Sequence, residues 1–132
     1  MRERGPRSRG LLVLCAAALL SACGGGGSPS APAPPPSNPY QIVISPAGVM
    51  TPSQLTVPAG SRVLFVNNHS RAHEIASDPH PEHTDCPEIN QVGLLAPGQS
   101  RETGNLVIAR TCGVHDHDDP LNASLHARIT IQ

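Results

Sequence analysis

The chain has 132 residues, a formal net charge of −1 at pH 7, and nine basic residues that are all arginine. This near-neutral balance argues against nucleic acid and anionic lipid head groups as ligands, because clustered positive charge is what recognises both. Aromatic residues make up only 2% of the sequence, so the core of a folded domain must consist of Val, Ile and Leu.

Residues 1–22 have the layout of a secretory signal peptide. Four arginines precede the apolar run 11–20, which is too short to span a bilayer. The next residues, Leu20-Ser21-Ala22-Cys23, resemble the bacterial lipobox. This resemblance implies that Cys23 is the first mature residue and carries a lipid, the only expected membrane contact. The protein would then be anchored in a bacterial cell envelope, facing the periplasm or the exterior. An ordinary signal peptide that merely contains a cysteine is the alternative.

Residues 23–39 predict a disordered tether, and residues 40–132 predict one small domain. The tether is almost wholly Gly, Ser, Ala and Pro and has no hydrophobic periodicity, so it cannot bury a core. The remaining length suffices for a single hydrophobic core.

Short apolar runs between frequent turn signals predict an all-β domain. The expected strands are 41–45, 51–57, 62–67, 99–103, 109–115 and 128–131. Their spacing, without a convincing helical period, indicates an antiparallel sandwich or barrel with one long loop. Residues 87–95 are compatible with one short helix.

All seven histidines lie between residues 69 and 126, and most of them lie in two segments. The first segment, residues 67–86, contains His69, His73, His80, His83 and Cys86. The second segment, residues 111–120, contains Cys112, His115 and His117. Imidazole and thiolate are ligands that suit copper, zinc and iron. The clustering predicts a metal site, with copper as the favoured metal and zinc as the alternative, built from two distant segments.

His115 and His117 are expected to bind one ion together. Residues i and i+2 of a strand share a face, so both imidazoles can point to the same metal. Asp116 would then face the other way and serve as a hydrogen-bond partner. A solvated polar turn is the alternative interpretation of this H-D-H-D-D run.

His80 and His83 are secondary candidates because they lie in a loop that contains Pro79 and Pro81, which restrict its backbone. They could complete the first site, form a second one, or bind no metal. His69, in a turn, and His126, before the last strand, have no predicted role.

Three interpretations of Cys86 and Cys112 remain open. An even pair in an oxidising compartment predicts a disulfide, which would contribute roughly 3 kcal/mol by closing a long loop. Alternatively, Cys112 is a copper thiolate and Cys86 is a free thiol. In the third interpretation, both cysteines join His80 and His83 in a zinc-type site.

The pattern V-x-x-G-x-x-V-x-F-x-N of residues 57–67, the histidine that follows it, and C-x-x-H at 112–115 resemble the plastocyanin/azurin-type cupredoxins. This resemblance covers nearly all of residues 40–132. It implies a cupredoxin-like Greek-key β-sandwich or barrel whose copper ligands are His73, Cys112 and His115. No methionine stands where this family has its axial ligand.

Three segments also resemble a bacterial lipoprotein subgroup of this family that carries an H-D-H motif. They are S-D-P-H-P-E-H-T-D at 77–85, L-A-P-G-Q-S at 95–100 and H-D-H-D-D-P at 115–120. This resemblance implies a histidine-based metal site that needs no thiolate.

The expected function is copper binding for electron transfer or copper handling, with a redox partner or copper donor that the sequence does not identify. A small copper or copper–zinc redox enzyme, such as a superoxide-dismutating protein, is one alternative. A structural sandwich that binds zinc is the other. No acid/base pair or nucleophile arrangement is evident, so a role in metal binding or electron transfer is favoured over catalysis.

Overall fold

The structure is a computed structural model that describes residues 37–132. The predicted signal peptide, the lipidation site Cys23 and residues 23–36 of the predicted tether lie outside this range. At the start of the described range, the Asn38 side chain donates hydrogen bonds to the Arg62 carbonyl and to the Glu102 carboxylate. Within residues 37–132, no helix has the length and apolar character needed to cross a membrane.

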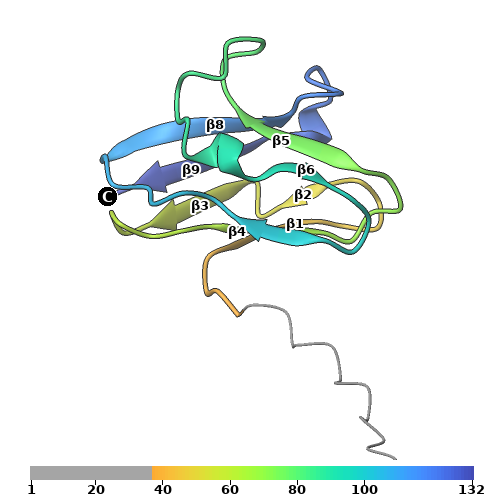
Figure 1. Ribbon diagram of the computed structural model, residues 1–132, viewed down its shortest axis with the longest axis horizontal. Helices are drawn as coiled ribbons and strands as arrows, with labels where there is room; N and C mark the ends of the chain where they lie inside the picture. Colours follow the sequence, from red (N-terminus) through yellow and green to blue (C-terminus); the bar gives the residue numbers. More distant parts are fainter. Residues whose placement is uncertain (1–36) are drawn as a thin grey trace, which may run out of the picture. The chain divides into compact units, whose positions relative to one another are not determined.

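Nine strands in the described residues form two sheets that lie over one another (Figure 1). The first sheet has the order β2 (Met50–Thr51), β1 (Gln41–Ile44), β4 (Leu64–Asn67) and β7 (Ser100–Glu102). The second has the order β3 (Gln54–Val57), β9 (Ala127–Ile131), β8 (Arg110–Asp116), β5 (His73–Ser77) and β6 (Gly93–Leu95). Two single 3₁₀ turns, η1 (Ile89–Gln91) and η2 (Ala123–Leu125), are the only helical elements in residues 37–132. The predicted all-β sandwich is confirmed.

The expectation of a purely antiparallel arrangement is wrong for two strand pairs. β1 pairs with β4 in parallel, and β3 pairs with β9 in parallel, while the other pairs are antiparallel. Parallel neighbours need a crossover connection. Here the chain leaves the first sheet after β2 and enters the second sheet with β3. The single strand expected over 51–57 is therefore divided at Pro52-Ser53, where proline lacks a donor for the ladder.

Strands β5 and β6 were not predicted from the sequence. The β5 sequence H-E-I-A-S has one large apolar residue, Ile75. Its other four residues are typical of a polar loop. Residues 87–95, which were compatible with a short helix, contain only η1 before the chain extends into β6.

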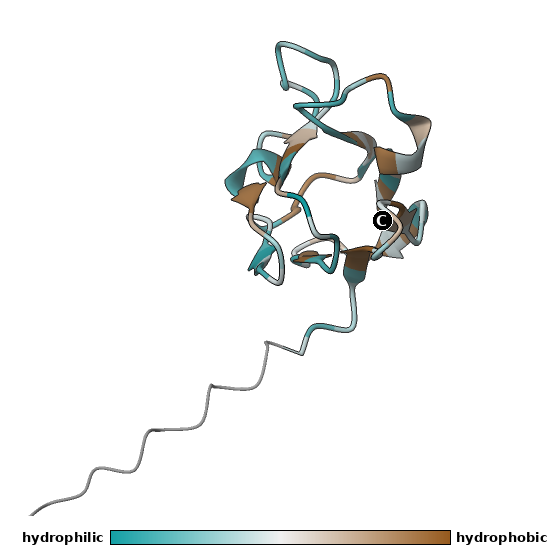
Figure 2. Ribbon diagram, turned by 90° about the vertical axis from the view of Figure 1, so that its right-hand side faces the viewer, coloured by the Kyte–Doolittle hydropathy of each residue, from teal (hydrophilic) through white to brown (hydrophobic). Residues whose placement is uncertain are grey.

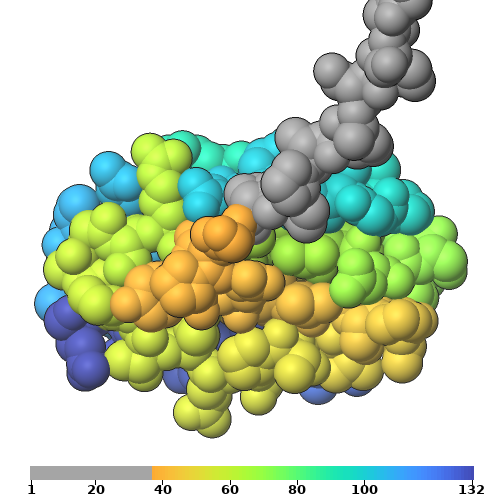
Figure 3. Space-filling model, turned by 90° about the horizontal axis from the view of Figure 1, so that it is seen from below, coloured from red at the N-terminus to blue at the C-terminus, as the bar shows by residue number. Residues whose placement is uncertain are grey.

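An aliphatic core fills the space between the sheets, as the composition required. Phe65 is the largest fully buried side chain, and it lies among isoleucines and valines from both sheets, including Ile42, Ile75, Val114 and Ile129. Strand segments coloured as hydrophobic occur in both layers in Figure 2. Much of the face shown in Figure 3 consists of residues from the start of the described range through β4.

Cys86 and Cys112 form a disulfide, with their Cα atoms 5.9 Å apart and both residues fully buried. This bond joins the segment before η1 to the middle of β8. Neither sulfur is a thiolate, so the copper-thiolate and zinc-type interpretations do not describe this structure.

Replacing both cysteines by alanine should reduce the free energy of unfolding by about 2–4 kcal/mol, because the unfolded chain regains the freedom that the cross-link removes. Urea unfolding of the double variant and of the oxidised protein measures the difference. Equal unfolding midpoints would contradict a disulfide between these residues.

Candidate metal centre

The loop of residues 78–86, which we call the histidine loop, rises from the end of β5 and carries His80 and His83 (Figure 1). Its backbone is ordered by its own hydrogen bonds, from the His83 amide to the Pro79 carbonyl at 2.7 Å and from the Asp85 amide to the Asp78 carbonyl at 2.8 Å. Side chains of Ser77 and Asn90 both donate to the His83 carbonyl. These contacts hold His83 in place without any ligand.

Strand β8 presents His115 to the histidine loop. Cys112 and Val114 belong to the core, and alternation along the strand turns His115 to the other face of the sheet. A side chain on this outer face would normally be exposed, yet His115 is only 1% exposed. The contacts of His115 with Asp78, His80 and His83 show that the histidine loop covers it.

Four imidazoles meet where the loop covers β8. Nitrogens of His80, His83 and His115 lie within 4.8 Å of one another. His117, directly after β8, places its Nδ1 3.2 Å from Nε2 of His83, and its ring centroid is 5.0 Å from that of His80. Two nitrogens that each lie about 2.0 Å from one metal ion are about 2.8–3.3 Å apart for bond angles of 90–109°. The cluster therefore has the donor type of a metal centre, and the His83–His117 pair has the nitrogen spacing of two ligands of one ion.

Asp78 sets the orientation of the His115 ring. Its Oδ1 lies 2.7 Å from Nδ1 of His115, which makes Nδ1 the protonated nitrogen and leaves a lone pair on Nε2. That Nε2 is buried and has no hydrogen-bond partner. An unsatisfied buried acceptor is unfavourable by about 1–3 kcal/mol, and a metal ion would satisfy it. Asp78 had no predicted role, although a carboxylate two residues before the candidate ligand His80 could have indicated one.

Gly113 makes room for this carboxylate. A Cβ atom at residue 113 would overlap Oδ2 of Asp78 and would also lie 2.5 Å from its Cγ. The Asp78 amide donates to the Gly113 carbonyl at 3.0 Å, so backbone and side chain of Asp78 both lie against this position. Glycine at residue 113 therefore lets the loop approach β8 closely.

Gly113→Ala should destabilise the protein by about 1–3 kcal/mol, because Asp78 must move and release His115. Gly104→Ala is the matched control, since a Cβ there meets the end of the flexible Gln91 side chain, which can turn away at little cost. Thermal unfolding compares the two variants. A larger loss in Gly104→Ala than in Gly113→Ala would contradict the close approach.

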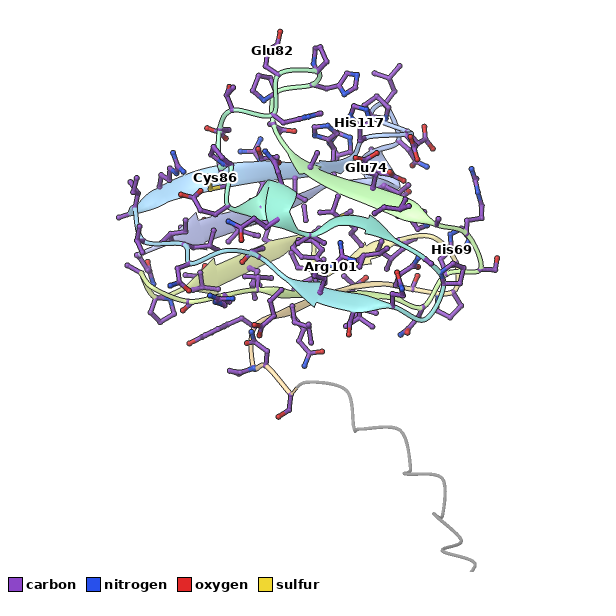
Figure 4. All side chains as sticks on the ribbon, in the orientation of Figure 1. His69, Glu74, Glu82, Cys86, Arg101 and His117 are labelled. Carbon is purple, nitrogen blue, oxygen red and sulfur yellow. A yellow bond between two sulfur atoms is a disulfide. The ribbon has the colours of Figure 1, made fainter. Side chains whose placement is uncertain are left out.

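The environment of His83 favours the uncharged imidazole that binds metals. Partial burial first, and then the charges of His115, His117 and His80, lower the pKa of His83 from its usual 6.5, while Glu74 acts in the opposite direction. Figure 4 shows Glu74 next to His117, under the loop that carries Glu82. Protons thus compete less with a metal at His83 than at a free histidine.

In the metal-free protein, His83 should titrate below pH 6.5. The unfolded chain then takes up this proton at higher pH than the folded chain does. The contribution of His83 to stability is therefore present above about pH 6.5 and falls as the pH decreases through that value towards the folded pKa. NMR titration of the ring protons measures this pKa, with His83→Gln for assignment. A value above 6.5 would contradict the packing of the four rings.

A second group lies on the opposite face of the same two strands. His73 is 3% exposed, its Nδ1 lies 2.6 Å from Oδ2 of Asp116, and its Nε2 lies 2.8 Å from Nδ1 of His69. Since Asp116 and His115 are neighbours on β8, they point to opposite faces. Figure 4 places the labelled His69 at the right-hand edge, apart from His117.

The structure therefore separates the sequence-predicted site residues. It brings His115 and His117 together with the secondary candidates His80 and His83. It does not bring His73 to them, and Cys112 lies in the core as a disulfide sulfur. Asp116 stands beside His73, where the family resemblance implied Cys112.

His69 and His126 had no predicted role. His69 contacts His73, which the four-residue separation across a turn could have indicated. His126 lies 3.0 Å from the Pro120 carbonyl, and its ring is 6.1 Å from that of His115. It remains a turn residue at the edge of the cluster.

Comparison with solved protein structures shows which known fold this chain shares. No family model and no curated protein sequence matches this chain. Among solved structures, it is similar to a purple cupredoxin from Nitrosopumilus maritimus, with 18% identity, a TM-score of 0.52, and coverage of 70% of this chain and 99% of the other. It is similar to plastocyanin from Dryopteris crassirhizoma, with 19% identity, a TM-score of 0.55, and 70% and 100% coverage. A mutant amicyanin in its Cu(I) form has 13% identity, a TM-score of 0.52, and 70% and 81% coverage. The predicted cupredoxin-like fold is confirmed.

Proposed function

We propose that this cupredoxin-like domain binds one copper ion between the histidine loop and β8. The ligands are His80, His83, His115 and His117. The observation that carries the proposal is Nε2 of His115, which is buried, unpartnered and oriented by Asp78 within reach of two other histidines. Copper is the metal named for the Cu(I) amicyanin that shares this fold.

The donor set supports copper on chemical grounds. For a given set of nitrogen donors, divalent copper binds more tightly than zinc and the earlier first-row metals. A site of imidazoles, without thiolate or thioether, is harder than a blue-copper site and favours Cu(II) over Cu(I). A bound copper ion would supply one-electron redox chemistry.

The surroundings of the ligands favour copper handling over electron transfer. His115 is buried and held by Asp78, and His83 is held through its carbonyl, so these two hold the ion in a fixed position. His80 is exposed and lies in the same loop, where it can release the ion to a partner or receive it. Electron transfer is the second candidate, and the likeness to plastocyanin and amicyanin structures favours it. The partner would be a copper donor or acceptor in the first case and a redox protein in the second.

Copper binding is tested with the purified protein, Cu(II) and a competing chelator. We expect a type-2 EPR signal with nitrogen couplings and no strong visible band, because Cys112 is in a disulfide. The tightly held ion should be lost in His83→Gln/His117→Gln and retained in His126→Gln, the control histidine outside the cluster. An intense thiolate-to-copper band, or retention of the tightly bound copper ion in the double variant, would contradict this proposal.

Asp78→Ala should weaken copper binding by about 10- to 100-fold, the usual effect of removing the carboxylate behind a metal-bound histidine. Glu82→Ala is the control, since it removes the same charge from an exposed position in the same loop. Competition titrations give both affinities. Equal losses in the two variants would point to net charge, and not to the orientation of His115, as the cause.

The proposed location is the bacterial cell envelope, with a lipid on Cys23 as anchor. The basis is the sequence of residues 1–23 alone. Expression with a labelled fatty acid should label the protein, and Cys23→Ala should abolish the label and release the protein from membranes. Labelling that persists in Cys23→Ala would exclude this anchor.

A further inference from the structure

We propose that Glu74 makes the histidine cluster selective for Cu(II) over Cu(I), because its carboxylate lies beside His117 and His83. This inference rests on the proposed copper centre and assigns the preferred oxidation state of that centre to one acidic side chain.

Strand register brings Glu74 to the cluster. Ile75 lies in the core, so alternation along β5 turns Glu74 to the outer face of the sheet, which also carries His115. Ile75 pairs with Asp116 on the antiparallel strand β8, so Glu74 lies opposite His117. The His117 amide donates to the Glu74 carbonyl at 2.7 Å, which continues this pairing beyond the end of β8. Figure 4 shows the two residues next to each other.

The Glu74 carboxylate is free to act on a bound ion. Among the ion pairs within residues 37–132, none includes Glu74. On its other side, Glu74 pairs with Leu94 of the edge strand β6, which carries no charge. Glu74 is also partly buried, so water and salt screen its charge less than that of an exposed residue.

The charge of Glu74 acts on a proposed ligand even without metal. Burial and the neighbouring histidines lower the pKa of His83, and Glu74 acts in the opposite direction, because a carboxylate stabilises a positive charge nearby. A copper ion bound to His83 would be attracted in the same way.

The charges in the cluster balance a divalent ion. The four imidazoles are neutral ligands, and two carboxylates accompany them: Glu74 beside His117, and Asp78 hydrogen-bonded to His115. With Cu(II) these charges add up to zero, whereas with Cu(I) they leave one negative charge. An unbalanced charge that is shielded from water is unfavourable, so this arrangement favours Cu(II).

The remaining charged groups around the cluster are more exposed. Arg128 faces the same side from β9, but it is exposed and lies two strands away from Glu74. Glu82 and Asp85, in the histidine loop, and Asp118, after β8, are exposed as well. Solvent weakens the effect of these groups on a bound ion, which leaves Glu74 and Asp78 as the main determinants.

Affinities for both oxidation states test the proposal, with Cu(II) and Cu(I) as probes and a competing chelator for each. Ascorbate maintains Cu(I), because a thiol reductant would also open the disulfide. In Glu74→Gln, the affinity for Cu(I) should fall about tenfold, the lower end of the effect of one neighbouring charge. The affinity for Cu(II) should fall about 100-fold, because a fixed charge attracts a divalent ion with twice the energy. The midpoint potential of the bound copper should then rise by about 59 mV, which corresponds to a factor of ten for one electron.

Two further variants serve as controls. Glu82→Gln removes the same charge from an exposed position in the histidine loop, and it should leave the potential close to that of the wild type. Glu74→Asp keeps the charge and should retain the preference for Cu(II).

The outcomes separate this inference from the copper centre itself. Equal losses of affinity for Cu(I) and Cu(II) in Glu74→Gln would mean that Glu74 only supports the structure, and this inference would be overturned while the copper centre stands. A shift of the potential in Glu82→Gln as large as that in Glu74→Gln would overturn it equally. A wild-type protein that binds neither ion would overturn the copper centre, and the role of Glu74 with it.

Discussion

The histidine loop is attached to β8 at both of its ends, and the geometry of the histidine cluster depends on this double attachment. At one end, Asp78 binds His115 through its carboxylate and Gly113 through its amide. At the other end, Cys86 is covalently bonded to Cys112. The partners on β8 lie within four residues of one another, so the loop must lie along the strand. An outward-facing histidine is buried as a result, and its free nitrogen is enclosed by other imidazoles.

Alternation along β8 explains why two histidine groups form and not one. His115 and Asp116 are adjacent in sequence but point to opposite faces of the sheet. Each becomes one half of a carboxylate–imidazole pair, with Asp78 on the outer face and His73 on the inner face. The H-D-H sequence therefore contributes an imidazole to one face and a positioning carboxylate to the other. One strand can contribute to two histidine groups because its side-chain period is two.

Local sequence patterns were sufficient to predict the fold class and the type of core. Turn residues and short β-branched runs indicated an all-β sandwich, and the composition required an aliphatic core. The i, i+2 spacing of His115 and His117 indicated a common direction, and both residues do contact the same two histidines. By contrast, β5 was missed because its polar residues are buried by tertiary contacts, which no local pattern shows.

The ligand set could not be read from spacing alone. The C-x-x-H motif of residues 112–115 implied that Cys112 lies beside His73, yet strand pairing aligns Ile75 with Asp116 and places Asp116 there. A shift of four residues along β8 keeps the same face towards the core, so the apolar pattern does not distinguish the two registers.

The sequence by itself determined the fold class, the aliphatic core, and the concentration of metal-binding side chains in two segments. These follow from composition and short-range periodicity, which act within a few residues. Only the tertiary structure decided which histidines meet, that Asp78 and Asp116 orient them, and that the cysteines are joined. Those outcomes depend on strand register and on how the histidine loop folds over β8. Both are set by contacts between residues more than 20 positions apart, such as the 26-residue separation of the disulfide and the 37-residue separation of Asp78 from His115.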